Sequence, residues 1–165
     1  MSDYMKPNSS LKDIRFRDWI NYNTDISKAL KLLIELEDIF YDIYKISSDN
    51  DQCYPEFEDF MLQIGEIRKE YTRYVDDNKF ILQFTEMKEH LIDDRYEKWI
   101  TKDCKVSKAL KILIELEDIF SNIDDFYIIN GHRYNEFEDF MLHVDNIRYK
   151  FVKKVESDKS LFDIK

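Results

Sequence analysis

The chain has 165 residues, and its 35 acidic against 25 basic side chains give a formal net charge of -10 at pH 7. It contains only two glycines and two prolines, whereas an average domain contains roughly 7% glycine and 5% proline. Sandwiches, barrels and glycine-looped nucleotide folds need many special backbone conformations, so this composition excludes them. The negative charge argues against direct binding to nucleic acid or to an anionic membrane.

The cysteines and the apolar stretches indicate a cellular compartment. Cys53 and Cys104 are far apart and lack the spacing of metal ligands, which is typical of a protein in a reducing compartment. The first residues are polar and lack the apolar stretch of a signal peptide. No stretch approaches the roughly 18 apolar residues that suggest a membrane span. We therefore expect a cytoplasmic protein with no membrane-spanning segment.

The sequence contains one unit twice. Three pairs of matching segments share an offset of 80 residues: 27–40 with 107–120, 56–62 with 136–142, and 11–20 with 91–100. About 32 of the 69 aligned positions are identical, with no insertion or deletion. The sequence therefore predicts a tandem duplication, with repeats over 11–79 and 91–159.

The spacing of apolar residues predicts three helices in the first repeat. The first begins after Ser9 or Ser10, either of which can cap it, and ends near residue 22. The second covers about 25–46, and its wide apolar stripe indicates a central position. The third begins at Pro55, which suits a first helical turn, and ends near residue 75.

The same helical pattern continues through the rest of the chain. A continuous helical connection is predicted over about 78–100, and it includes the first helix of the second repeat. The second repeat follows the plan of the first, and 160–165 form a C-terminal tail. We expect an all-α fold of about six helices, arranged as two three-helix units that pack into one compact bundle.

Each repeat places two opposite charges inside apolar helix stripes. On a wheel at 100° per residue, Glu37 lies within the stripe of the second helix, and Arg68 within that of the third. An antiparallel hairpin brings these two positions together. Because a lone buried charge costs several kcal/mol, we expect the ion pair Glu37–Arg68 and its counterpart Glu117–Arg148, each fixing the register of its hairpin.

Other partners and roles for these glutamates stay open. Arg15 and Arg95 are competing partners for them. A second interpretation makes Glu37 and Glu117 ligands of a carboxylate metal site, but di-iron bundles need Glu-x-x-His motifs, and no histidine of this chain follows a glutamate at that spacing. We therefore expect no metal.

Motifs of catalysis are missing from the sequence. There is no glycine-rich phosphate loop, no Gly-x-Ser-x-Gly and no His-Glu-x-x-His. The three histidines, His90, His132 and His143, are scattered. We expect neither an enzyme nor a cofactor, with a helical enzyme or metal protein kept as an alternative.

Acidic pairs recur on the polar sides of the predicted helices in both repeats: Glu35 with Asp38, Glu58 with Asp59, Glu115 with Asp118, and Glu138 with Asp139. Regularly spaced carboxylates on a rigid body can imitate the phosphates of a nucleic acid, and can then occupy the basic groove of a protein that binds one. The competing interpretation is a solvated face that keeps the protein in solution.

A second candidate surface lies only in the second repeat. Four consecutive apolar or aromatic residues, Phe126, Tyr127, Ile128 and Ile129, stand where the first repeat has a polar break between helices. An exposed apolar cluster marks an interaction site. The competing interpretation packs these residues into the core, against the C-terminal tail.

These features favour a function in protein binding. The leading hypothesis is a non-enzymatic inhibitor, of the phage anti-defence or toxin-immunity type, that covers a basic surface of its target protein. The alternative is a scaffolding protein that binds a partner helix between its repeats. Duplication can replace an ancestral homodimer, so the sequence favours a monomer and leaves a homodimer open.

Overall fold

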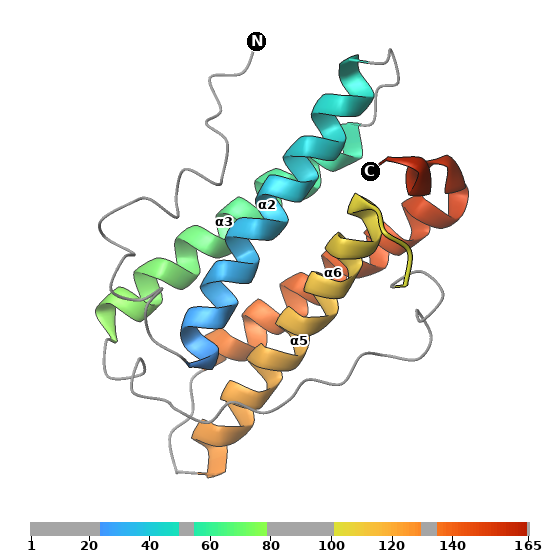
Figure 1. The fold of residues 1–165 in the computed structure, drawn as a ribbon. Helices are drawn as coiled ribbons and strands as arrows, with labels where there is room; N and C mark the ends of the chain where they lie inside the picture. Colours follow the sequence, from blue (N-terminus) through green and yellow to red (C-terminus); the bar gives the residue numbers. More distant parts are fainter. Residues whose placement is uncertain (1–23, 50–54, 79–100, 130–134, 165) are drawn as a thin grey trace. The chain divides into compact units, whose positions relative to one another are not determined.

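The computed structural model describes residues 24–49, 55–78, 101–129 and 135–164 (Figure 1). Within these ranges the fold is all-α, with four α-helices and one short 3-10 helix. Contact density divides the chain into two compact units, residues 1–86 and 87–165. No helix in the described ranges combines the length and the apolar character that crossing a membrane requires.

In the first unit, α2 (Asp25–Asp49) and α3 (Pro55–Asp77) form a hairpin (Figure 1). Thr24 caps α2, because its hydroxyl accepts a hydrogen bond from the backbone N–H of Ser27 at 3.4 Å. Pro55 suits the first position of α3, where a backbone N–H has no partner within the helix. Both helices begin where the sequence predicts.

The core of the first unit lies between α2 and α3. The Phe40 ring lies 6.3 Å from that of Phe57 and 5.6 Å from that of Phe60, measured between ring centroids. Tyr71 is fully buried, and its hydroxyl donates a hydrogen bond of 2.6 Å to the backbone carbonyl of Ile26. An early residue of α2 therefore meets a late residue of α3, and a later one meets the start of α3, so the two helices are antiparallel.

In the second unit, α5 (Lys105–Ile129) and α6 (Asn135–Ser157) form the corresponding hairpin. The Phe120 and Phe140 rings lie 5.6 Å apart in its core. A short 3-10 helix, η4 (Lys159–Asp163), follows α6 and packs against both helices.

The four described helices repeat the offset seen in the sequence. The helices of the second hairpin start and end 80 residues after those of the first, as comparison of 25–49 with 105–129 and of 55–77 with 135–157 shows. The predicted total of six helices is not confirmed, because the residues expected to form the first helix of each repeat and the helical connection over about 78–100 lie outside the described residues. The three-helix repeat, its boundaries and the single bundle stay predictions.

Two expectations about the second unit need correction. The segment 126–129 is not a break, because α5 continues through it to Ile129. The C-terminal tail does not pack against this segment: Lys105, in the first turn of α5, donates its backbone N–H to the carbonyl of Ile164 at 3.2 Å. With a rise of 1.5 Å per residue, that turn is about 30 Å from residue 126. Leu161 of η4 is buried, so η4 closes the other end of the hairpin.

Candidate functional site

The ion pair predicted in the first unit forms between α2 and α3. Glu37 is fully buried and accepts a hydrogen bond from Nε of Arg68, whose side chain is 14% exposed. Gly65 lies beside this carboxylate, and a Cβ at that position would be 3.6 Å from Oε1 of Glu37. A buried negative charge is thus neutralised by a guanidinium that still reaches water, which limits the cost of its burial.

The predicted pair of the second unit also forms, and it has a third member. Nε of Arg148 donates to Oε2 of Glu117 at 2.8 Å, while Nη2 of the same guanidinium donates to Asp145. Asp145 is also hydrogen-bonded to Glu117. Within the described residues, Arg148 therefore binds two carboxyl groups, and the competing partners Arg15 and Arg95 lie outside those residues. Sequence reasoning missed Asp145, although the offset of 80 residues aligns it with Gly65.

The second carboxyl changes the chemistry of the cluster. Burial raises the pKa of Glu117 from 4.5 to about 7, the hydrogen bond with Asp145 raises it as well, and Arg148 acts in the opposite direction. Two carboxyl groups share a hydrogen bond only when one of them keeps its proton. The second hairpin therefore has a glutamate that gains or loses a proton near neutral pH.

The acidic residues predicted to bind a partner all reach the surface, to different degrees. Glu35, Asp59 and Asp139 are exposed, and the half-buried ones are Asp38, Glu58, Glu115, Asp118 and Glu138. The side chains of Phe126, Tyr127, Ile128 and Ile129 lie outside what the structure describes, so their role stays a prediction. The acidic residues are therefore the predicted surface whose positions are known.

Folding separates charge along the second hairpin. The half next to the connection, residues 112–129 and 135–146, carries nine carboxylates and no lysine or arginine. The opposite half, residues 101–111 and 147–164, carries nine lysines and arginines against four carboxylates. Because the hairpin is antiparallel, acidic segments that are separate in the sequence meet at one end of the unit.

The first hairpin shows the same acidic end. Residues 32–49 and 55–66 carry nine carboxylates against one lysine. The other half, residues 24–31 and 67–78, carries five basic side chains against four carboxylates. We call the half of each hairpin that lies next to its connection the acidic end.

Helix stability explains only part of this separation. The carboxylates in the first turns of α3 and α6 suit the positive end of the helix dipole. In α5 the order is reversed, with three lysines among the first seven residues and Asp124 and Asp125 in the last six. The lysines in the first turn oppose the dipole at a cost of a few tenths of a kcal/mol each, whereas Asp124 and Asp125 lie before the last turn, where the effect is small.

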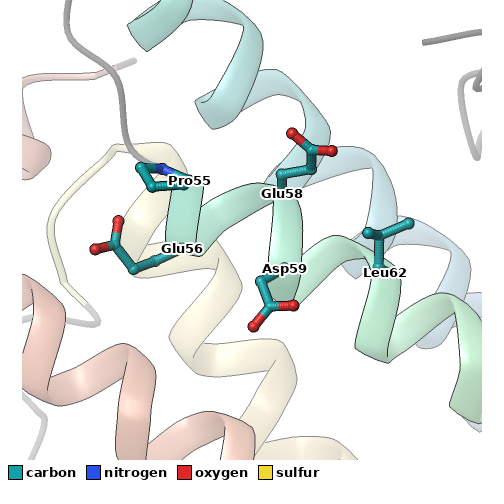
Figure 2. A pocket seen from close by; sticks show the side chains of 5 residues that line it. All are labelled: Pro55, Glu56, Glu58, Asp59 and Leu62. Carbon is teal, nitrogen blue, oxygen red and sulfur yellow. The ribbon is translucent and has the colours of Figure 1, made fainter.

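The start of α3 presents an acidic surface with an apolar residue in it (Figure 2). A shallow depression of about 490 Å³ is lined by Pro55, Glu56, Glu58, Asp59 and Leu62. Figure 2 shows Glu58 and Leu62 projecting to one side of the helix and Asp59 to the other. Leu62 is 46% exposed, although a leucine in a helix hairpin ordinarily packs into its core.

The start of α6 repeats these residues. Glu136, Glu138 and Asp139 precede Leu142, which is 52% exposed. Sequence reasoning missed both leucines as surface residues. The signal was present, because each leucine ends an exact seven-residue repeat at a position outside the apolar stripe of its helix.

Neither metal chemistry nor a known relative identifies the site. Among the residues that the structure describes, no three His, Cys, Asp or Glu side chains are grouped as metal ligands. Comparison of the chain with protein-family models, with curated proteins and with solved structures found no significant match.

Proposed function

We propose that this protein is a non-enzymatic binding module whose acidic ends cover a basic surface of a partner protein, in the manner of an inhibitor. The partner's surface is one that itself binds nucleic acid or another anion. The observation that supports this proposal is the separation of charge along each hairpin. Each acidic end has nine acidic residues, of which Glu37 in the first and Glu117 and Asp145 in the second are bound by an arginine, whereas the residues predicted to bind a partner reach the surface.

Electrostatics explain why such an end favours a basic partner. Carboxylates of one sign on a rigid body add their potentials, which accelerates encounter with a positive surface and repels a negative one. Antiparallel pairing holds the carboxylates of two helices at fixed spacing, so little conformational entropy is lost when a partner binds. On this proposal, α5 has its lysines at its start, against the helix dipole, because that keeps basic side chains out of the acidic end.

The experiment is a pull-down from a lysate of the native host with the full-length chain, at about 0.1 M and about 0.5 M salt. Screening is stronger at the higher concentration, because the Debye length is about 10 Å at 0.1 M. We expect one basic protein to be captured at low salt and released at high salt. Capture of an acidic protein, or of a protein that stays bound at the higher salt concentration, would contradict the proposal.

A pair of matched variants localises the binding. Glu138→Gln with Asp139→Asn removes two charges from the acidic end, and Glu156→Gln with Asp163→Asn removes two from the opposite half. Both double variants have the same net charge. We expect only the first to lose the partner, with binding weakened about tenfold or more; equal losses would show that net charge alone matters.

A further inference from the structure

Two carboxyl groups of the second hairpin bind the same guanidinium and are hydrogen-bonded to each other. Nε of Arg148 donates to Oε2 of Glu117 at 2.8 Å, Nη2 donates to Asp145, and Asp145 is hydrogen-bonded to Glu117. We call these three residues the carboxyl cluster. When two carboxyl groups lie in contact, ionisation of one disfavours ionisation of the other, so the pair keeps one proton to a higher pH than a lone glutamate does.

The carboxyl cluster lies within the acidic end of the second hairpin. Glu117 and Asp145 belong to residues 112–129 and 135–146, which carry no lysine or arginine, and the side chain of Asp145 is 51% exposed. Glu138 precedes Asp145 by two helical turns, so the two side chains lie on the same side of α6, about 10 Å apart along its axis. This separation is about one Debye length at 0.1 M salt, so a cation bound at Glu138 acts on the cluster.

The charged groups that face Glu117 come from α6. Burial raises the pKa of Glu117 most, the hydrogen bond with Asp145 raises it as well, and Arg148 lowers it, with a result of about 7. A depression of about 470 Å³ beside Asp145 and Arg148 is also lined by Lys153 and Glu156, whose charges are opposite. The hydrogen bond between the two carboxyl groups is therefore the contact that makes this cluster differ from a simple ion pair.

Other charged groups of the second unit lie farther away or can be replaced. η4, the other described element that packs against α5, carries Lys159 and Asp163, and it lies at the start of α5, about 18 Å along the helix from Glu117. His143 is exposed on α6, and a histidine can change its charge near neutral pH. Arg95, the competing partner, lies outside the described residues.

We propose that the carboxyl cluster links partner binding at the second acidic end to the release of a proton. A basic partner brings positive charge to this end, which favours the ionised form of the carboxyl pair and displaces the proton that the pair shares. By linkage, the partner binds more tightly as pH rises through neutrality, because fewer clusters then hold the proton that binding displaces. The inference rests on the proposed function and adds to it regulation by pH.

The first hairpin provides an internal comparison. It has Gly65 at the position of Asp145, and its buried Glu37 is paired with Arg68. This pair has no second carboxyl group at position 65 to share a proton with. A partner at the first acidic end therefore displaces no proton from that position, and the pH response belongs to the second hairpin.

The test uses the full-length chain with His143→Gln, which installs the residue that the first hairpin has at this position. The probe is a peptide of about ten lysines with both ends blocked, because lysine keeps its charge between about pH 5.5 and about pH 8. Calorimetric titration at about pH 6.5, in two buffers with different heats of ionisation, counts the protons released. We expect about 0.3 proton per chain at saturation, and an affinity about twofold or more higher at pH 8 than at pH 5.5.

Three variants in the same background locate the source of the proton. Asp145→Asn and Glu117→Gln each remove one of the two carboxyl groups while keeping the size of the side chain, so both should lose most of the release. The matched control is Asp139→Asn, which removes one exposed carboxylate of the same helix outside the cluster. It should bind the peptide somewhat more weakly and still release the proton.

The outcomes separate this inference from the proposed function. Salt-dependent binding of the peptide without proton release, or with equal release by Asp145→Asn and Glu117→Gln, would overturn the inference and leave the proposed function standing. Loss of the release in Asp139→Asn as well would also overturn it, because net charge rather than the cluster would then set the response. If the peptide does not bind at about 0.1 M salt, or binds equally well at about 0.5 M, the proposed function and the inference both fail.

Discussion

Gly65 and Asp145 occupy the same position in the two hairpins, and each lies beside a glutamate of the facing helix, Glu37, which is fully buried, and Glu117, which is half-buried. Gly65 adds no carboxyl group beside the Glu37–Arg68 pair, whereas Asp145 hydrogen-bonds to Glu117 and also binds Arg148. A single difference in sequence thus separates an ion pair from a cluster in which two carboxyl groups compete for one guanidinium. The stability of the two hairpins should respond differently to pH.

The second hairpin should lose stability as pH rises toward neutrality. The pKa of Glu117 is about 7 in the folded protein, against an ordinary value of 4.5 for a glutamate in the unfolded chain. Between these values the folded state binds more protons than the unfolded state, so the free energy of unfolding falls from about pH 4.5 to about pH 7 and then levels off. The loss is at most about 3 kcal/mol, and less because water reaches the group. Hydrogen exchange of α5 and α6 amides across this range measures it.

Asp145→Asn tests the cause of this dependence. The variant removes the competing carboxylate while keeping the size of the side chain, so the pKa of Glu117 should fall and the pH dependence should shrink by about 1 kcal/mol or more. Asp139→Asn, on the same helix but outside the cluster, is the control and should leave the slope unchanged. An unchanged slope in Asp145→Asn would contradict the role given to this residue.

Two substitutions at Gly65 should have opposite signs. Gly65→Ala should stabilise the first hairpin by about 0.5–1 kcal/mol, because alanine is the better helix former and its Cβ would make an ordinary contact of 3.6 Å with Glu37. Gly65→Asp introduces the additional carboxylate of the second hairpin, here beside a glutamate that is fully buried. It should destabilise by about 2 kcal/mol or more at pH 7. Urea unfolding measures the free energy of unfolding of both variants. If Gly65→Ala destabilises the protein, the site has no room for a methyl group.

A double-mutant cycle should show that the Glu37–Arg68 pair specifies register more than it stabilises. Arg68→Met leaves the Glu37 carboxylate buried without its guanidinium and should cost about 3–5 kcal/mol. Adding Glu37→Leu should restore most of that loss, because a well-packed apolar pair of similar volume is often as stable as a buried ion pair. Urea unfolding of the wild type, both single variants and the double variant gives the coupling energy. A double variant no more stable than Arg68→Met would contradict this.

The sequence predicted the ion pairs because helical phase alone shows which charges lie in an apolar stripe. Glu37 and Arg68 are each improbable there by themselves, and an antiparallel hairpin brings them together. The contact between Arg148 and Asp145 was not predictable in the same way. Asp145 lies at the edge of the apolar stripe, where an aspartate is a common surface residue. Its effect depends on the distance between side chains of two helices, which periodicity does not supply.

The segment 126–129 shows a second limit of sequence reasoning. Analogy with the polar residues of the first repeat predicts a break there, yet α5 continues through it. Four apolar residues have no turn chemistry, so nothing local ends the helix before Asn130 and Gly131. The exposed leucines were missed for a different reason: an apolar residue outside a stripe is common enough to be passed over, and only the known burial of its neighbours shows that it is exposed.

A hydrogen bond between α2 and α3 closes the far end of the first hairpin. Tyr71 is fully buried, and its hydroxyl donates to the carbonyl of Ile26 at 2.6 Å. The second hairpin has Phe151 at this position, buried to nearly the same extent, so the site accepts a ring without a hydroxyl. Tyr71→Phe should therefore keep the fold and lose only the hydrogen bond, at a cost of about 1 kcal/mol. Faster amide exchange at the start of α2 and the end of α3 would report it, with Tyr149→Phe, an exposed tyrosine, as the matched control. A loss above about 3 kcal/mol would mean that removing the hydroxyl disturbs packing, contrary to the comparison with Phe151.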